Sequence, residues 1–434
     1  MDRRKFLKSS LFGVGAAATG SLISCRTNAE IAKTTVPLNT SGYINEPARQ
    51  IPIVDRAAVV VLGGGPAGVA AAISAARCGV DVMLLERQYT LGGLWTGCCV
   101  LPVNNTHGCL PDGTWKQVVF GFSHEVLERL RAVDRCIRVK ESPTPDPEAA
   151  KYMLEQIVQE TGVRLLYGCQ GVSVAMSGDR IQAVIAECKS GRVAIEAGCV
   201  VDCSGDGDIL EWTHETFELR TEAIGAMWRM GGDKNIGRTS TPNEGVRLCH
   251  MTGEQDQNGL DVYNLTRLQM KMRAEMWAKA AAEQQKAGCE GVFVLDSGSL
   301  PGVRITRVLQ SVQGVRYEDT MTRREYPDVI GLGGSEYMSY TFRGETIPRC
   351  QRPCWQIPFS ALTPQRVQNL LVGGRCFDFD VPLSYDAREV ATCFVTGQAA
   401  GVAAAIATQT RTDVQHIEIA RLQQQLRKQK VQLS

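Results

Sequence analysis

The sequence predicts an α/β fold: a parallel sheet that carries an antiparallel meander, with an α+β region inserted between its parts. Three observations predict it. An apolar, β-branched run at residues 57–62 stops at glycine and leads into an alanine-rich stretch, which is typical of a buried parallel strand followed by a helix. Strand-like stretches separated by polar turns follow within residues 172–195. A further strand that ends in glycine comes at residues 369–374, so the chain returns to the sheet after a long insertion.

The composition is that of a globular protein with a large core. Apolar residues make up 44% of the 434 residues and charged residues 21%, and this length suggests two or three domains or one large domain with insertions. The 47 Lys and Arg nearly balance the 46 Asp and Glu, so the net charge of +1 argues against a nucleic-acid partner. The 16 cysteines show no paired CxxC spacing, so we expect no metal site.

The first 25 residues predict an export signal. Asp2–Lys8 is a basic head, and Ser9–Ser24 is uncharged, rich in alanine and glycine, and too short to span a bilayer. The head resembles a twin-arginine signal, and the sequence LISC resembles a lipobox whose Cys25 becomes lipidated. The alternative is a basic terminus with a short buried helix. We therefore expect a protein exported to the periplasm or cell envelope that contacts the membrane only through a lipid on Cys25.

A glycine-rich loop follows the first predicted strand. The sequence GGGPAG matches the pattern GxGxxG and is followed by an alanine-rich helical stretch. In this pattern Gly63 makes the tight turn, Gly65 lets a pyrophosphate approach bare backbone, and Gly68 lets the helix pack closely on the strand. The helix start at Pro66 and Ala67 would then bind the phosphates with its free N–H groups.

A carboxylate stands at the spacing at which it would accept a ribose hydroxyl. Glu86 ends the second predicted strand, 86 − 63 = 23 positions after Gly63, and Arg87 follows it. This signature fits NAD and FAD alike, because both present the same ADP end. A second glycine cluster, which contains Gly92 and Gly93, looks like the loop that many flavoproteins place beneath the pyrophosphate and flavin, and it favours FAD.

Later segments complete the predicted sheet. A helical stretch at residues 151–161 and a strand at 163–167 come before a meander, and an apolar strand at 199–206 follows it and ends in small residues. The meander strands are residues 172–176, 181–188 and 193–195.

This ordered set of motifs resembles the FAD-dependent oxidoreductase family, which is related in fold to glutathione reductase and to the fumarate reductase flavoproteins. The resemblance covers about residues 57–433 and includes VVVLGGGPAG, LLERQYTLGG, VVDCSGDGDIL and TGQAAGVAAA. It implies a Rossmann-like FAD-binding domain, with a parallel sheet plus an antiparallel three-stranded meander, and an inserted α+β substrate or cap domain. FAD is the implied cofactor, and Gly374 and Arg375 would meet its ribityl chain or pyrophosphate.

Domain boundaries and FAD-binding residues follow from the motifs and the resemblance together. We expect an export signal with a lipobox-like end at 1–25, a linker at 26–56, FAD-binding segments at 57–105, 151–210 and 363–410, an insertion at 106–150, a substrate or cap domain at 211–362, and a C-terminal helix at 411–434. The expected FAD-binding residues are Gly63, Gly65, Pro66, Ala67, Gly68, Glu86, Arg87, Gly92, Gly93, Gly374 and Arg375.

The substrate side carries fewer sequence signals. Arg304 and Arg307 fall in an arginine-rich stretch of the family and would clamp an anionic or polar substrate or stabilise a developing oxyanion, with surface salt bridges as the alternative. Arg388 stands where the family tends to have arginine. The histidine that often precedes that arginine is missing, so Tyr385 or Asp386 would carry the proton. The catalytic candidates are therefore Arg304, Arg307, Tyr385 and Arg388.

Two helical stretches have both a structural and a functional interpretation. The stretch after Ala387 would direct its N-terminus at the flavin N1 and C2 carbonyl, and its Gly397 and Gly401 either pack against another helix or contact the cofactor. A second stretch is expected to pack in the core with its residues Met270, Met272, Met276 and Trp277.

The leading functional hypothesis is an exported enzyme that transfers a hydride from a small organic substrate to FAD. Electrons would pass to a quinone, a redox protein or a small oxidant, because soluble nicotinamide is not expected outside the cytoplasm. One alternative is a non-catalytic FAD-binding surface lipoprotein. Another is a flavin-dependent thiol oxidoreductase that uses Cys98 or Cys99, although Trp95 stands where the partner cysteine would be. A purely NAD-dependent dehydrogenase ranks last.

Overall fold

The computed structural model describes residues 42–139, 142–335, 340–342, 345–348 and 351–434. The chain divides into two compact units, Met1–Thr35 and Val36–Ser434, and every described residue lies in the second. The predicted export signal and Cys25 therefore lie outside the described residues.

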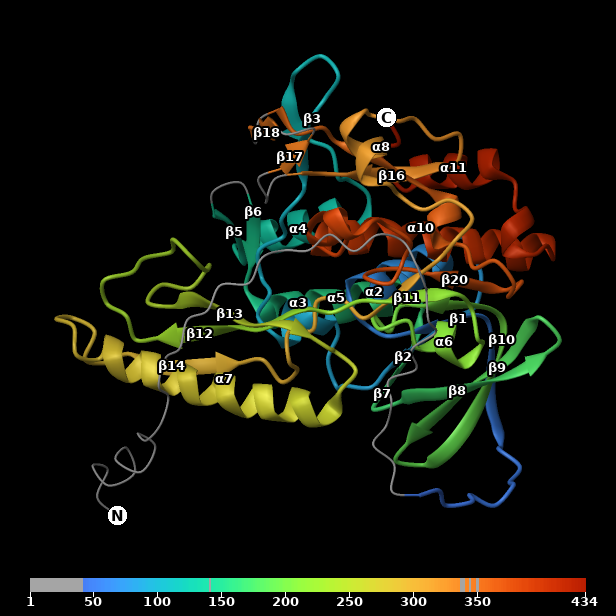
Figure 1. The fold of residues 1–434 in the computed structure, drawn as a ribbon, viewed down its shortest axis with the longest axis horizontal. Helices are drawn as coiled ribbons and strands as arrows, with labels where there is room; N and C mark the ends of the chain where they lie inside the picture. Colours follow the sequence, from blue (N-terminus) through green and yellow to red (C-terminus); the bar gives the residue numbers. More distant parts are fainter. Residues whose placement is uncertain (1–41, 140–141, 336–339, 343–344, 349–350) are drawn as a thin grey trace. The chain divides into compact units, whose positions relative to one another are not determined.

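The core of the second unit is one sheet in the order β7-β2-β1-β10-β9-β8, with β20 also paired to β10 (Figure 1). β1, β2, β7, β10 and β20 run parallel, while β8, β9 and β10 form an antiparallel meander. This confirms the predicted fold class. The strands are β1 (Ile53–Leu62), β2 (Val82–Glu86), β7 (Arg164–Tyr167), β8 (Gln170–Ser177), β9 (Arg180–Cys188), β10 (Gly191–Asp202) and β20 (Leu370–Val372).

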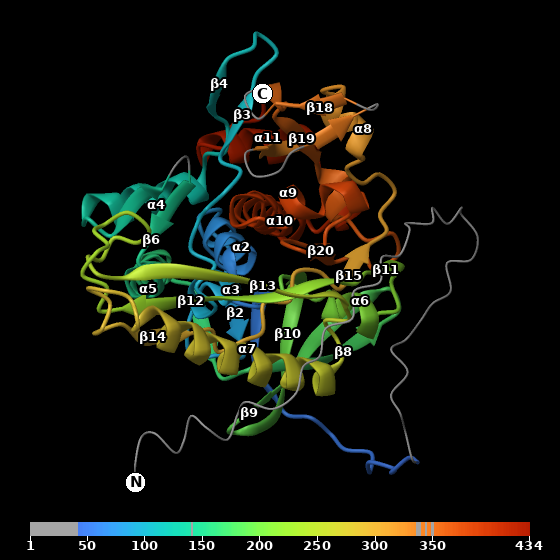
Figure 2. The same ribbon diagram turned by 60° about the vertical axis from the view of Figure 1, so that its left-hand side comes forward.

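Two helices, α2 (Pro66–Ala76) and α10 (Val390–Thr410), pack directly against each other beside this sheet (Figure 2). A Cβ built on Gly397 would collide with the carbonyl oxygen of Ala67, and one on Gly401 with that of Ala71. Both glycines therefore serve close helix packing. Among the described helices, α10 alone is long and apolar enough to cross a membrane, but its apolar window is entirely buried within the fold. Such burial is typical of a core helix.

A second layer consists of the antiparallel sheet β13-β12-β14, covered on one face by the long helix α7 (Figure 1). Met272 and Met276 of α7 are buried against this sheet, as expected. Met270 and Trp277 are 68% and 64% exposed, so their prediction as core residues was wrong. The elements are β12 (Glu222–Gly231), β13 (Arg247–Gln257), β14 (Phe293–Ser297) and α7 (Val262–Glu283).

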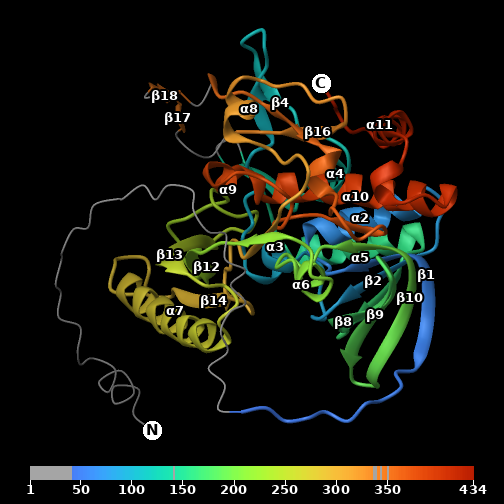
Figure 3. The same ribbon diagram turned by 45° about the vertical axis from the view of Figure 1, so that its right-hand side comes forward.

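Short two-stranded sheets and short helices complete the described structure (Figure 3). The strands form the pairs β3 (His107–Cys109) with β4 (Trp115–Gln117), β5 (Cys136–Val139) with β6 (Ser142–Pro145), β11 (Phe217–Leu219) with β15 (Arg307–Leu309), β16 (Val329–Gly333) with β19 (Trp355–Pro358), and β17 (Tyr340–Phe342) with β18 (Glu345–Ile347). The helices are α3 (Gly93–Gly97), α4 (Phe122–Ala132), α5 (Pro147–Thr161), α6 (Asp208–Trp212), α8 (Tyr317–Met321), α9 (Ser384–Ala387), α11 (Ile419–Lys428), η2 (Phe359–Leu362), η3 (Val381–Leu383) and η4 (Val414–His416).

Candidate functional site

The loop between β1 and α2 leaves open space where a phosphate would bind. Gly65 is the N-cap of α2, and no side chain caps the helix, so its first N–H groups remain available. A Cβ built on Gly65 would meet nothing within 4 Å. Protein packing therefore does not require glycine at this position, whereas a ligand approaching the backbone would.

Gly63 and Gly68 are required by the fold itself. Gly63 has φ of +98°, and a Cβ there would collide with the carbonyl oxygen of Cys203. A Cβ on Gly68 would collide with the carbonyl oxygen of Gly63. These two glycines let the start of α2 pack tightly against β1 and the end of β10.

Glu86 lies at the end of β2 and faces this loop. Its carboxylate accepts hydrogen bonds from the backbone N–H groups of Gly64 and Gln88, each at 2.6 Å, and the residue is 6% exposed. Burial raises the pKa of Glu86, and these two hydrogen bonds act in the opposite direction. The neighbouring Arg87 is exposed.

The second glycine cluster and the chain's C-terminal part both reach the same loop. Gly92 donates its N–H to the carbonyl oxygen of Gly64 at 2.8 Å, and a Cβ on Gly93 would lie 3.0 Å from the Cα of Gly65. Gly374 has φ of +85°, and a Cβ there would lie 3.0 Å from the Cβ of Ala67. Segments far apart in sequence thus converge on the start of α2.

A loop after β10 adds acidic groups to this region. Asp202 is fully buried and accepts hydrogen bonds from the backbone N–H groups of Ser204, at 3.0 Å, and Ile209, at 2.9 Å. Arg375 donates to the carbonyl oxygen of Val303 at 2.5 Å and to Asp206 at 3.3 Å. Sequence reasoning did not single out Asp202 or Asp206, although both lie within the VVDCSGDGDIL motif.

Arg307, at the start of β15, contacts this loop. Its guanidinium donates to the backbone oxygen of Asp206 at 3.0 Å and forms ion pairs with Asp208 and Glu211. Burial, followed by the charges of Asp202 and Asp206, raises the pKa of Asp208 to about 7, and Arg307 opposes that shift.

The other three catalytic candidates gather around Glu222 at the start of β12. Arg388 and Arg304 approach the same carboxylate oxygen of Glu222, at 3.5 Å and 4.0 Å. The Arg388 guanidinium also lies 4.8 Å from the ring centroid of Tyr385, a cation–π contact. The structure thus brings Arg304, Tyr385 and Arg388 together, while Arg307 has different partners.

Two guanidinium groups approach one carboxylate oxygen in this cluster. The side chains of Arg304, Arg388 and Glu222 are only 15%, 12% and 19% exposed. Arg388 Nε and the second oxygen of Glu222 are buried and have no hydrogen-bond partner among the described residues. Two largely enclosed guanidinium groups next to each other suit an anionic or strongly polar ligand. Glu222 was missed by sequence reasoning, because no motif marks it.

Asp386 in α9 is a buried carboxyl group whose surroundings favour its protonated form. It is fully buried; one oxygen accepts from the Asn105 side-chain amide at 2.6 Å, and the other has no hydrogen-bond partner among the described residues. Burial, followed by the charge of Glu389, raises the pKa of Asp386 well above its usual range. Asp386 can therefore donate a proton or a hydrogen bond.

Cys98 and Cys99 are buried free thiols. Cys98 donates to the carbonyl oxygen of Leu300 at 2.9 Å, and Cys99 contacts the carboxylate of Asp296 at 3.5 Å. Burial raises the pKa of Cys98 to about 11, and burial together with Asp296 raises the pKa of Cys99 to about 12. The part of the chain that the structure describes holds no cluster of His, Cys, Asp and Glu that could bind a metal ion.

Comparison with known proteins finds partial relatives and distant structures. Dihydrolipoyl dehydrogenase of Vibrio cholerae is 30% identical over 105 residues, 24% of this chain and 19% of that protein, and digoxin reductase of Eggerthella lenta is 35% identical over 102 residues, 23% of this chain and 18% of that protein. The matched part thus spans about a fifth of these relatives. A geranylgeranyl bacteriochlorophyll reductase-like protein of Thermoplasma acidophilum has a TM-score of 0.45 at 13% identity, covering 87% of this chain and 84% of that one. The OxyS anhydrotetracycline hydroxylase of Streptomyces rimosus also has a TM-score of 0.45 at 13% identity, covering 86% and 66%.

The loops around α2 fit the ADP end of FAD, because they combine an uncapped helix start, open space at Gly65 and a buried carboxylate at Glu86. The family model of FAD dependent oxidoreductases matches residues 58–227 and 211–426, which is most of the chain. The chain therefore belongs to the FAD dependent oxidoreductase family, and it is an enzyme whose cofactor is FAD.

Proposed function

We propose that this enzyme is exported and oxidises a small anionic or strongly polar organic substrate, with electrons then leaving to an acceptor other than a nicotinamide. The observation that supports the substrate class is the pair of largely enclosed arginines, Arg304 and Arg388, that approach the same carboxylate oxygen of Glu222. A substrate carboxylate or oxyanion would accept hydrogen bonds from these two guanidinium groups.

Bound FAD supplies the hydride acceptor, and the chain's residues bind and orient the substrate. In this proposal Arg304 and Arg388 clamp the substrate's anionic group, while Glu222 positions both guanidinium groups. Tyr385, which lies under Arg388, would face the same substrate. The raised pKa of Asp386 favours its protonated form, which suits hydrogen-bond donation more than removal of a substrate proton. The FAD-binding residues in the proposal are those predicted from the motifs, with Asp206 and Arg307 supporting the loop after β10.

The export part of the proposal is supported by sequence alone, through the basic head at Asp2–Lys8 and the lipobox-like sequence that ends at Cys25. Outside the cytoplasm a quinone, a redox protein or a small oxidant would accept the electrons. Metabolic labelling of the native full chain with a radioactive fatty acid would test the lipid anchor, and a Cys25→Ser variant that keeps the label would contradict it.

The two alternative functions have less support. A non-catalytic surface protein does not agree with membership in a family of oxidoreductases. A thiol relay needs a reactive thiolate, whereas the raised pKa values of about 11 and 12 keep Cys98 and Cys99 protonated near pH 7.

Anaerobic reduction of the FAD-loaded enzyme tests the proposal directly. A panel of hydroxy acids, amino acids, sugars and neutral polyols is added without oxygen, and loss of the oxidised flavin absorbance is followed. We expect carboxylate-bearing compounds to reduce the flavin and neutral polyols of similar size to leave it oxidised. Reduction by the neutral compounds alone, or by NADPH alone, would contradict the proposal.

A further inference from the structure

Helix α7 presents an outer face that no other described element covers (Figures 1 and 3). Its inner face packs on the sheet β13-β12-β14 through Leu268, Met272, Met276 and Ala280. On the opposite side Tyr263, Met270 and Trp277 are 87%, 68% and 64% exposed. α7 is therefore apolar on two faces, and only one of them contributes to the core.

The three large exposed side chains form one stripe. Tyr263, Met270 and Trp277 are spaced by seven residues, 270 − 263 and 277 − 270, and such a spacing drifts by only about 20° per step around a helix. Fourteen residues of α-helix span roughly 21 Å. The stripe is thus a continuous apolar ridge along most of α7.

Only basic charges border this ridge. Among residues 262–282 the exposed side chains are the apolar Val262, Tyr263, Met270, Ala274, Trp277, Ala278 and Ala282, the polar Thr266, and the basic Arg267, Lys271, Arg273 and Lys279. The exposed set contains no carboxylate, and Glu275 is half-buried. An outward surface of this kind attracts anions.

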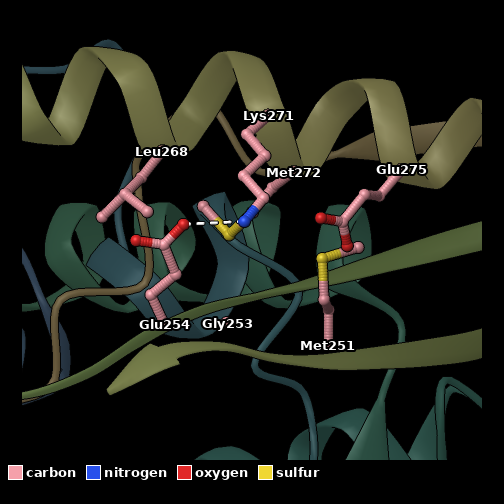
Figure 4. A pocket seen from close by; sticks show the side chains of 7 residues that line it. All are labelled: Met251, Gly253, Glu254, Leu268, Lys271, Met272 and Glu275. Atoms are coloured by element: carbon pink, nitrogen blue, oxygen red, sulfur yellow. Dashed lines mark hydrogen bonds and ion pairs between the residues drawn. The ribbon is translucent and has the colours of Figure 1, made fainter. Parts of the chain in front are cut away.

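A carboxylate of the underlying sheet balances part of the positive charge on α7. Glu254 of β13 pairs with Lys271 at 2.7 Å (Figure 4) and with Arg267 at 2.7 Å, and these two cations lower the pKa of Glu254 to about 2. Arg273 and Lys279 form no ion pair with any residue that the structure describes. Two cations against one carboxylate, together with two unpaired cations, leave the face positively charged.

We propose that the outer face of α7 docks on the surface of an anionic lipid bilayer, with the helix lying in the plane of the interface. A helix with Trp, Tyr and Met on one stripe and Arg and Lys beside it has the pattern of an interfacial helix. Anionic headgroups match its charge. A second copy of the chain fits less well, because a symmetric pair of these faces would oppose basic residues with no exposed carboxylate between them. The docking requires neither the proposed substrate nor the proposed lipid on Cys25.

Vesicle sedimentation tests this proposal. The FAD-loaded full chain with Cys25→Ser, which removes the proposed lipid site, is the test protein. We expect it to bind vesicles of phosphatidylglycerol and phosphatidylethanolamine, to release them at high salt, and to bind pure phosphatidylcholine weakly. Retained flavin absorbance reports that each variant is folded.

Variants of α7 then locate the binding face. The double change Met270→Ser and Trp277→Ser should lower the partition coefficient at least about tenfold. Arg273→Gln with Lys279→Gln should lower binding to the anionic vesicles by about fivefold per removed cation and leave phosphatidylcholine binding unchanged. Tyr152→Ser, which removes an exposed aromatic residue of α5, is the matched control and should bind like the parent.

Three results would overturn the proposal. Failure of the parent chain to sediment with anionic vesicles would show that it does not dock on such a bilayer. Equal binding by the Met270 and Trp277 variant would place any membrane contact elsewhere. A dimer seen by analytical ultracentrifugation that Trp277→Ser dissociates, without vesicle binding, would assign the face to a second copy of the chain.

Discussion

The loops around α2 and the proposed substrate cluster at Glu222 are built from different parts of the chain. Around α2 the contacts are made by backbone and by glycines, with Gly65 open, Gly68 packed, and the chain near Gly374 lying against Ala67. At Glu222 the chemistry resides in long side chains that come from β12, from the segment before β15 and from the turn before α10. The comparison teaches that a cofactor bound by backbone leaves a contiguous sequence motif, whereas a substrate bound by scattered side chains does not.

The largest expected effect is at a glycine that the fold itself requires. Gly68→Ala would place a methyl group against the carbonyl oxygen of Gly63, where backbone rather than a flexible side chain must move. We expect the free energy of unfolding to fall by about 3 kcal/mol or more, with loss of bound flavin. Gly237→Ala is the control, because its Cβ would meet nothing within 4 Å. Chemical denaturation measures both, and equal stability of the two variants would refute the packing role.

Gly65→Ala separates ligand binding from folding within the same loop. Its Cβ meets no protein atom within 4 Å, so the apoprotein should keep its unfolding free energy to within about 0.5 kcal/mol. FAD affinity should nevertheless fall about 100-fold, because the methyl group would occupy the space that the pyrophosphate needs. Titration of the apoprotein with FAD, followed by flavin fluorescence, measures this. An unchanged affinity would show that the phosphates bind elsewhere.

The next largest effect is expected on the kinetics of variants in the arginine cluster at Glu222. Arg388→Gln should lower kcat/KM by about 10- to 100-fold, mostly through KM, because a buried charged contact to the substrate is lost. Arg307→Gln should instead weaken FAD retention and leave the substrate KM nearly unchanged, since Arg307 contacts Asp206 and Asp208. Steady-state kinetics at saturating FAD distinguish the two arginines. A similar rise in KM for both variants would show that Arg388 and Arg307 do not have separate roles.

The two regions also differ in how far sequence could predict them. The strand, loop and helix around GGGPAG are contiguous, so their spacing alone predicts the sheet and the phosphate loop. Arg304 and Arg307 lie three residues apart, yet Arg304 approaches Glu222 while Arg307 contacts Asp206 and Asp208, and no motif separates these two partner sets. Glu222 carries no motif. The two apolar faces of α7 look alike in sequence, because periodicity does not say which face the sheet β13-β12-β14 covers.

A pH effect on stability is expected at the edge of the substrate region. Because the folded state raises the pKa of Asp386, native protein binds a proton that the unfolded chain releases above about pH 4. Stability should therefore fall as the pH rises above that value, until the folded carboxyl itself ionises. Asp386→Asn should remove this part of the slope, because the amide stays neutral at every pH. Urea denaturation from pH 4 to 9 measures the unfolding free energy at each pH. Equal pH dependence in the parent and the variant would contradict the raised pKa of Asp386.

The smallest effect is expected at Cys98 and Cys99, for which the sequence left a redox role open. Serine at both Cys98 and Cys99 should change the rate of flavin reduction by less than about twofold, since both thiols stay protonated near pH 7. Stability should fall by about 1 kcal/mol, because a hydroxyl replaces each buried thiol. Rapid-mixing kinetics with the best substrate of the anaerobic panel measure the rate. A loss of a hundredfold or more would restore the thiol relay and would move part of the chemistry from the side chains around Glu222 to the loop after α3.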